Sequence, residues 1–145
     1  SIIDCYCGIG AITLPMSYKF NAVIGIESNK NSITLARTNA ALNLINNVEF
    51  FDGNVEDIIR SILDSSHGLI LDPPRKGLDI NVIKSIIKKR PRKIAYLSCN
   101  PSTLARDARL IIDSNFYKVE YLDPIDFFPQ TTHLECLLLF SSINF

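Results

Sequence analysis

The sequence has no excess of charge of either sign, because 15 basic residues are matched by 15 acidic ones. Charge alone therefore predicts neither a nucleic-acid partner nor a membrane surface. No apolar run approaches the roughly 20 residues of a membrane-spanning helix, and no secretory signal peptide is recognisable. The first residues lack an initiator methionine and already have the pattern of a strand. We expect one domain, residues 1–145, cut from a longer cytoplasmic protein.

Clusters of metal ligands are also missing. Cys5 and Cys7 lie close together, but no second cysteine pair follows at a spacing typical of zinc sites. The two histidines are too scattered to complete a ligand set. A disulfide framework is not expected in a domain of this size without a secretory signal. We predict reduced thiols and no metal site.

What the chain does have is an alternation of short apolar runs with amphipathic segments. Apolar runs predict strands, and apolar residues three and four positions apart predict helices. The last two apolar segments are separated only by a loop and predict a hairpin. The pattern is typical of an α/β fold with a mostly parallel seven-stranded sheet, an antiparallel last strand and helices on both faces. The expected strands are 2–5, 22–26, 48–51, 68–71, 94–97, 117–122 and 134–140, and the expected helices are 11–18, 31–43, 55–63, 80–88 and 104–112.

The segment 94–107 is the most informative one. An apolar strand runs into a turn at Cys99, and Ser102 or Thr103 can cap the helix that follows. Cys99 is therefore expected at the carboxyl end of a strand, where open α/β sheets bind ligands. Backbone amides and a helix dipole can lower the pKa of a thiol there and favour the nucleophilic thiolate. Taken alone, a single cysteine is more often buried and inert.

Polar residues follow the first three predicted strands. Gly8 lies in a Gly-x-Gly turn, although Thr13 interrupts the full dinucleotide-binding pattern. Glu27 ends the second strand, where an acid can accept hydrogen bonds from both hydroxyls of a ribose. Asn54 and Asp52 follow the third strand, and for Asp52 an ordinary turn or helix cap is the favoured interpretation. Together these positions favour a nucleotide-like ligand.

Two acids follow or precede later strands. Asp72 begins a rigid Asp-Pro-Pro loop, so it is either a ligand group or a solvated carboxylate. Glu135 heads the last apolar strand. Partial burial would raise its pKa toward the range useful for a general base, whereas a carboxylate in water is the alternative. His133 nearby is expected to make a local hydrogen bond.

The basic residues divide into two groups. Six of them fall between Lys84 and Lys93, at a helix end and at the amino ends of the strands, and predict a solvated face pointing away from the site. Arg75, Lys76 and Arg106 lie on the site side and are better placed to contact phosphate.

Three longer motifs occur in order: Asp72-Pro-Pro-Arg-Lys-Gly77, then Tyr96-Leu-Ser-Cys-Asn-Pro-Ser-Thr103, then Asp126-Phe-Phe-Pro-Gln-Thr-Thr-His-Leu-Glu135. With them, nearly the whole chain resembles the C-terminal catalytic domain of the S-adenosylmethionine-dependent RNA 5-methyluridine (uracil-C5) methyltransferases. The resemblance implies a Rossmann-like class I methyltransferase fold. It also implies that upstream RNA-binding and central domains of the family are missing from this chain.

The resemblance implies S-adenosylmethionine as the cofactor. Tyr6 and the Gly8 backbone would line its methionine end, and Glu27 would bind its ribose. Asn54 would lie near the adenine, and Asp72 near the sulfonium and the target base.

The resemblance further implies that Cys99 attacks C6 of a uracil and that Glu135 removes the C5 proton. The chemistry needs these residue types, because C5 of uracil is a poor nucleophile until a thiolate adds at C6. A base must then remove the C5 proton so that the thiolate can leave. The uracil must be out of the stack for Cys99 to reach C6, so we expect a flipped or loop uridine. It would lie in ribosomal or transfer RNA, with ribosomal RNA favoured.

Two other functions fit part of the pattern. A non-catalytic nucleotide- or RNA-binding module of the same fold needs Glu27 and the glycine turn, but neither Cys99 nor Glu135. An amino-methyltransferase acting on adenine or cytosine typically has an aromatic residue after the two prolines, where this chain has Arg75. The sequence predicts no oligomeric state.

Overall fold

The computed structural model describes residues 1–127, 129–130 and 134–143. The strands are β1 (Ile2–Cys5), β2 (Val23–Glu27), β3 (Val48–Asp52), β4 (Gly68–Leu71), β5 (Lys93–Ser98), β6 (Tyr117–Ile125) and β7 (Glu135–Ser142). The helices are α1 (Thr13–Ser17), α2 (Lys30–Leu42), α3 (Val55–Ile62), α4 (Ile80–Lys89) and α5 (Pro101–Ile112).

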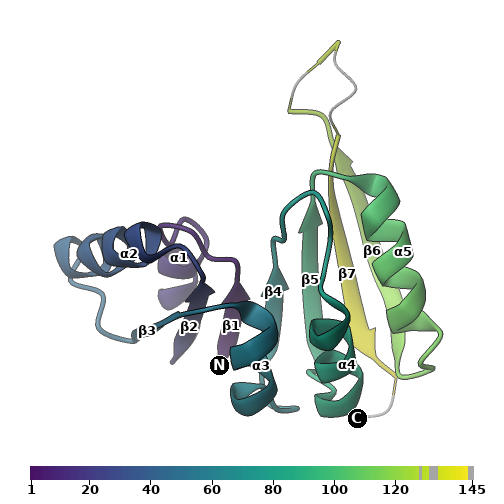
Figure 1. Ribbon diagram of the computed structural model, residues 1–145, viewed down its shortest axis with the longest axis horizontal. Coiled ribbons are helices and arrows are strands. Elements are labelled where there is room, and N and C mark those ends of the chain that lie inside the picture. Colours follow the sequence, from purple (N-terminus) through teal and green to yellow (C-terminus); the bar gives the residue numbers. More distant parts are fainter. Residues whose placement is uncertain (128, 131–133, 144–145) are drawn as a thin grey trace.

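All described strands form one sheet in the order β3-β2-β1-β4-β5-β7-β6 (Figure 1). The first five strands pair in parallel, and β7 pairs antiparallel with both β5 and β6. The predicted α/β architecture, with a mostly parallel sheet and an antiparallel last strand, is confirmed. Because β1 to β5 run parallel, their carboxyl ends lie at the same edge of the sheet (Figure 1).

Helices cover both faces of this sheet, as predicted. Apolar side chains of α3, α4 and α5 pack on one face, where Ile3 and Tyr96 belong to the main core cluster. On the other face, α2 packs around Phe50, and residues of α1 pack near Ile2 and Ile70. Ile2 and Ile3 reach opposite faces because successive strand residues alternate. No helix within the described residues is long and apolar enough to cross a membrane.

The beginnings of two helices differ from the prediction. α1 starts at Thr13 rather than at residue 11, because Gly8 and Gly10 both have positive φ angles and extend the turn. α5 starts earlier than predicted, at Pro101. A proline fits the first helical position because its φ is fixed and its missing N–H is not needed there. The cap is Asn100, whose side chain accepts a hydrogen bond from the Ser102 amide at 3.1 Å, so the predicted capping by Ser102 or Thr103 is wrong.

Candidate active site

β5 and β7 bring the predicted nucleophile and the predicted base to adjacent strand ends. The antiparallel register pairs Ser98 with Cys136 as the last pair of the ladder. The next residue outward is Cys99 on one side and Glu135 on the other. Cys99 is the first residue after β5, and Glu135 is the first residue of β7. Both are partly exposed, so the structure places a thiol and a carboxyl group together at an accessible edge.

The turn after β5 holds Cys99 through the buried side chain of Ser98. The Ser98 hydroxyl accepts from the Asn100 amide at 3.1 Å and lies 3.1 Å from the Asn100 carbonyl, to which it donates. These bonds close the turn around Cys99, the only one of the four free cysteines that is not buried. Burial raises the pKa of Cys7 to about 12 and that of Cys5 well above its ordinary value. Those two thiols therefore remain neutral.

Three acids lie along the same edge of the sheet. Asp72 directly follows β4, and Glu135 begins β7. Burial raises the pKa of Asp72, and the nearby charge of Glu135 raises it further. Asp4 in β1 interacts in turn with Asp72. This row of carboxyl groups is suited to a positively charged ligand, which would relieve the repulsion among them.

Asp4 is a site residue that sequence reasoning missed. Its side chain is only 1% exposed, and burial raises its pKa to about 6 although the Thr13 hydroxyl donates a hydrogen bond to it at 2.6 Å. Its second oxygen, Oδ1, is buried and has no hydrogen-bond partner among the described residues. An acid within an otherwise apolar, fully buried strand was the signal that could have identified it.

The predicted cofactor residues meet at the ends of β1 and β2. The Gly8 amide donates to Glu27 Oε2 at 3.1 Å, and the Asn29 amide donates to Oε1 at 2.8 Å. Gly8 has a φ of +55°, and a Cβ atom placed on it would meet no atom within 4 Å. The backbone therefore borders open space beside Glu27. Tyr6 starts this turn with a φ of +66°, and its half-buried ring packs against the main core cluster.

Two polar residues, Asp52 and Asn54, lie at the end of β3, next to the end of β2. Asp52 is the last residue of β3, opposite Glu27 in the parallel register. The cap position of α3 belongs to Asn54, although the Asn54 side chain makes no capping bond and instead donates to Asp57 Oδ2 at 3.1 Å. Asn54 is exposed. The predicted residues thus divide into a group on β1 to β3 and a group on β4, β5 and β7, with Asp72 adjoining both.

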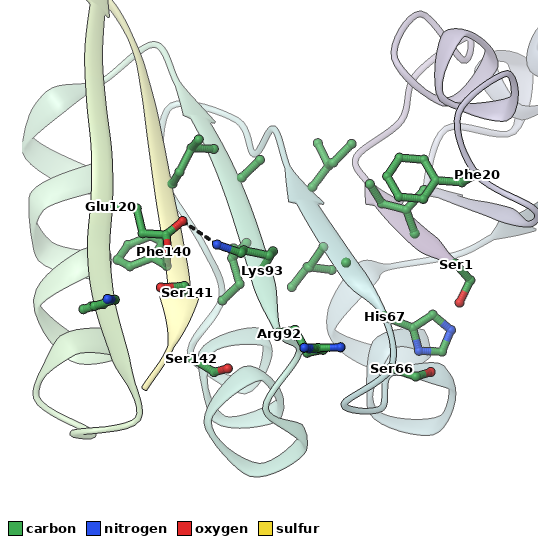
Figure 2. A pocket seen from close by; sticks show the side chains of 18 residues that line it. Ser1, Phe20, Ser66, His67, Arg92, Lys93, Glu120, Phe140, Ser141 and Ser142 are labelled. Atoms are coloured by element: carbon green, nitrogen blue, oxygen red, sulfur yellow. Dashed lines mark hydrogen bonds and ion pairs between the residues drawn. The ribbon is translucent and has the colours of Figure 1, made fainter. Parts of the chain in front are cut away.

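The remaining predictions concern basic residues, metals and His133. A cavity of about 750 Å³ lies on the sheet face opposite α3 to α5, and Arg92 and Lys93 of the basic run line it at the amino ends of the strands (Figure 2). Lys93 pairs there with Glu120 at 2.5 Å. None of the predicted site residues lines this cavity. Within the described ranges, no group of His, Cys, Asp and Glu could hold a metal ion. His133 lies outside the described residues.

Comparison with known proteins identifies the family. Residues 1–143 match the family model described as tRNA (Uracil-5-)-methyltransferase. The chain belongs to this family. An uncharacterised RNA methyltransferase of Synechocystis sp. is 41% identical over 143 residues, which are 99% of this chain and 31% of the relative. One of Prochlorococcus marinus is 47% identical over 137 residues, covering 94% of this chain and 33% of the relative. The chain thus spans about a third of the length of these curated relatives.

Solved structures agree with this assignment. The Pyrococcus abyssi tRNA (uracil-54, C5)-methyltransferase, solved with S-adenosyl-L-homocysteine, superposes with a TM-score of 0.85 at 31% identity. The match covers 96% of this chain and 33% of that one. An rRNA methylase from Streptococcus thermophilus, at 13% identity and a TM-score of 0.78, shares the fold, with 98% of this chain and 86% of that one covered. The class I methyltransferase fold is confirmed, and S-adenosylmethionine is supported as the cofactor.

Proposed function

We propose that this protein transfers a methyl group from S-adenosylmethionine to C5 of a uridine in RNA, with Cys99 as the nucleophile and Glu135 as the general base. The observation that supports the proposal is the register of β5 and β7, in which Cys99 and Glu135 each lie one residue beyond the Ser98–Cys136 pair at adjacent strand ends. Asp72 lies near Glu135, and the charge of Glu135 raises the pKa of Asp72. A binding module needs no such pairing of a thiol with a carboxylate.

The residues fit a sulfonium cofactor. Open space beside Gly8 leaves room for a ligand against the backbone, and Glu27 at the next strand end can accept hydrogen bonds from ribose hydroxyls. Asn54 is exposed one strand further, where an adenine can reach its amide. Asp4 in β1 and Asp72 directly after β4 interact with each other, and a cationic sulfonium near these two carboxyl groups would be favoured.

In the proposed reaction Cys99 acts first and Glu135 second. The Cys99 thiolate forms a bond to C6 of the uracil, and the electron pair of the C5–C6 double bond moves toward C5 and O4. When bound, S-adenosylmethionine would supply the methyl group that C5 takes up, and the electron pair of the broken bond between sulfur and methyl would stay on the sulfur of S-adenosylhomocysteine. Glu135 then takes the C5 proton, the double bond re-forms, and the bond between sulfur and C6 breaks to release the thiolate. A positioned base of this kind typically contributes about 10²–10⁴-fold to the rate.

The proposed substrate is a uridine of RNA that Cys99 can reach. We infer a flipped or loop uridine, since a stacked base hides C6 from Cys99. Ribosomal RNA stays the first substrate to test and transfer RNA the second. Because this chain spans about a third of the length of its relatives, we propose that RNA affinity comes largely from parts of the protein outside residues 1–145. We also propose a cytoplasmic location, which suits the four free cysteines.

The test is methyl transfer by the intact protein to unmodified ribosomal and transfer RNA, followed by mass spectrometry of the digested nucleosides. We expect 5-methyluridine from the native protein and none from Cys99→Ala, while both bind S-adenosylmethionine with equal affinity. Cys136→Ala is the matched control, because Cys136 is a buried neighbour on β7 and is predicted to leave the product unchanged. Methyl groups found only on exocyclic nitrogens, or normal methylation by Cys99→Ala, would contradict the proposal.

A further inference from the structure

The first turns of α5 hold the backbone of the loop that follows β4. Asn100 Nδ2 donates to the Arg75 carbonyl at 3.1 Å, and the Thr103 hydroxyl lies 3.2 Å from the same carbonyl and 3.1 Å from the Asn100 carbonyl, so it can donate to either. Arg106 Nη2 donates to the Lys76 carbonyl at 3.0 Å. These three side chains are spaced three residues apart and so lie along one side of the helix. They replace solvent around two carbonyl groups of the loop.

Asp107 completes the contact from inside the protein. It is fully buried, and its Oδ2 accepts from the Leu78 amide and from the Tyr96 hydroxyl, each at 2.8 Å. Its Oδ1 accepts from Arg106 Nε at 2.9 Å. Hydrogen bonds to a charged group are stronger than those between neutral groups. We name the set of Asn100, Thr103, Arg106 and Asp107 the α5 clasp.

Gly77 shows how closely the loop and helix meet. A Cβ atom on Gly77 would lie 2.5 Å from Asp107 Oδ2 and 2.7 Å from Arg106 Nη2. Its φ of +79° is also one that residues with side chains rarely adopt. The Gly77 amide donates to the Pro74 carbonyl at 2.9 Å and closes a turn within the loop. The loop therefore packs so closely against α5 that a side chain at position 77 has no room.

The loop and the helix that make this contact both begin at the proposed active site. The loop begins directly after Asp72, and α5 begins directly after the turn that holds Cys99 (Figure 1). We propose that the α5 clasp is a positioning device, which holds Asp72 in place relative to Cys99 and so sets the rate of methyl transfer rather than cofactor affinity. The inference rests on the proposed function. Cofactor affinity should change much less than the rate, because Asp72 is only one of the proposed cofactor residues. Gly8 follows β1 and Glu27 ends β2, and the hydrogen bonds of the clasp among the described residues reach neither of them.

Two substitutions loosen the clasp, and a third is their matched control. Thr103→Val removes one donor to the loop without changing the shape of the side chain, and Arg106→Gln shortens the reach to Lys76. Arg109→Gln is the same chemical change three residues later on α5, at an arginine that pairs with Asp113 of its own helix end at 2.8 Å. All are compared in the intact protein at a temperature where each is fully folded.

Steady-state kinetics give the first readout. We expect kcat to fall about 10- to 100-fold in Thr103→Val and Arg106→Gln, since small misplacements of reacting groups have effects of this size. KM for S-adenosylmethionine should stay within about twofold of the native value. Arg109→Gln should match the native protein in both constants. An unchanged kcat in both clasp variants, or an equal loss of kcat and cofactor affinity, would overturn the inference.

The pKa of Asp72, followed by carbon-13 NMR without RNA or cofactor, gives a second readout that needs no activity. Burial and the charge of Glu135 on β7 raise this pKa, and Asp4 on β1 lies near as well. If the clasp holds Asp72 in place, the pKa should fall toward its ordinary value in both clasp variants and not in Arg109→Gln. A pKa that does not move overturns the inference. If the native protein makes no 5-methyluridine but the pKa moves, the proposed function fails while the positioning of Asp72 stands.

Discussion

Asp4 should make the cofactor-free protein less stable as the pH rises. Its pKa lies at about 6 in the folded protein, against an ordinary value of 3.8, because its carboxyl group is buried. Between these two pH values the folded state binds more protons than the unfolded state, so the free energy of unfolding decreases with increasing pH. A difference of roughly 2 pKa units, at 1.36 kcal/mol each, corresponds to about 3 kcal/mol. The contribution is favourable below about pH 4 and is lost by about pH 7.

Urea unfolding of native protein and Asp4→Asn, followed by circular dichroism from pH 4 to pH 8, measures this effect. The native protein should lose about 2 kcal/mol relative to Asp4→Asn between pH 4 and pH 8, most of the full effect, because asparagine does not titrate. Asp64→Asn is the control. Asp64 is exposed, and hydrogen bonds from Ser66 lower its pKa to about 2, so it does not titrate in the range. A difference between native protein and Asp4→Asn that stays constant with pH would refute the reasoning.

Three further predictions follow from single positions. Gly8→Ala should lower the free energy of unfolding by about 1 kcal/mol, because alanine is strained in this left-handed backbone conformation. It should weaken S-adenosylmethionine binding, measured by calorimetry, at least about tenfold, because the added Cβ enters the open space beside the backbone. An unchanged affinity would contradict this. Glu135→Gln should accumulate a covalent adduct of protein and methylated RNA on denaturing gels, since no base removes the C5 proton, and rapid turnover without adduct would exclude Glu135 as the base. Gly77→Ala should lower the free energy of unfolding, measured in urea, by about 2–4 kcal/mol, because backbone strain adds to a clash with Asp107. A loss no larger than that of Gly8→Ala would contradict the close packing of the loop against α5.

Most of the strands and helices could be predicted because their signals are local. β1 and β4 coincide with the predicted segments, since both are apolar runs bounded by polar residues and lie in the middle of the sheet. α2 and α3 begin and end within about a residue of the prediction for a similar reason, their apolar side chains recurring at helical spacing. The start of α5 was missed because Asn100 and Pro101 together cap and begin the helix, and Ser102 offered a competing local signal.

The site needed information that no local pattern holds. That Cys99 and Glu135 lie at adjacent strand ends depends on the pairing of β5 with β7, two segments that are distant in the sequence. Asp107 was missed although its spacing from Leu104 and Ile111 places it on the buried side of α5, where a polar residue should have drawn attention. Its partners come from the loop after β4 and from β5, so the sequence alone could not have named them.

The central claim is that Cys99 attacks C6 of a uridine while Glu135 serves as the base. The most direct measurement mixes the intact protein with S-adenosylmethionine and RNA carrying 5-fluorouridine, then looks for a protein–RNA adduct that resists denaturation. Fluorine cannot leave C5 as a proton does, so the reaction should stop with the thiol still bonded to C6. We predict an adduct that maps to Cys99, forms only with the cofactor present and is lost in Cys99→Ala. No adduct with any uridine-containing RNA, despite confirmed cofactor binding, or an adduct that persists in Cys99→Ala, would contradict the account.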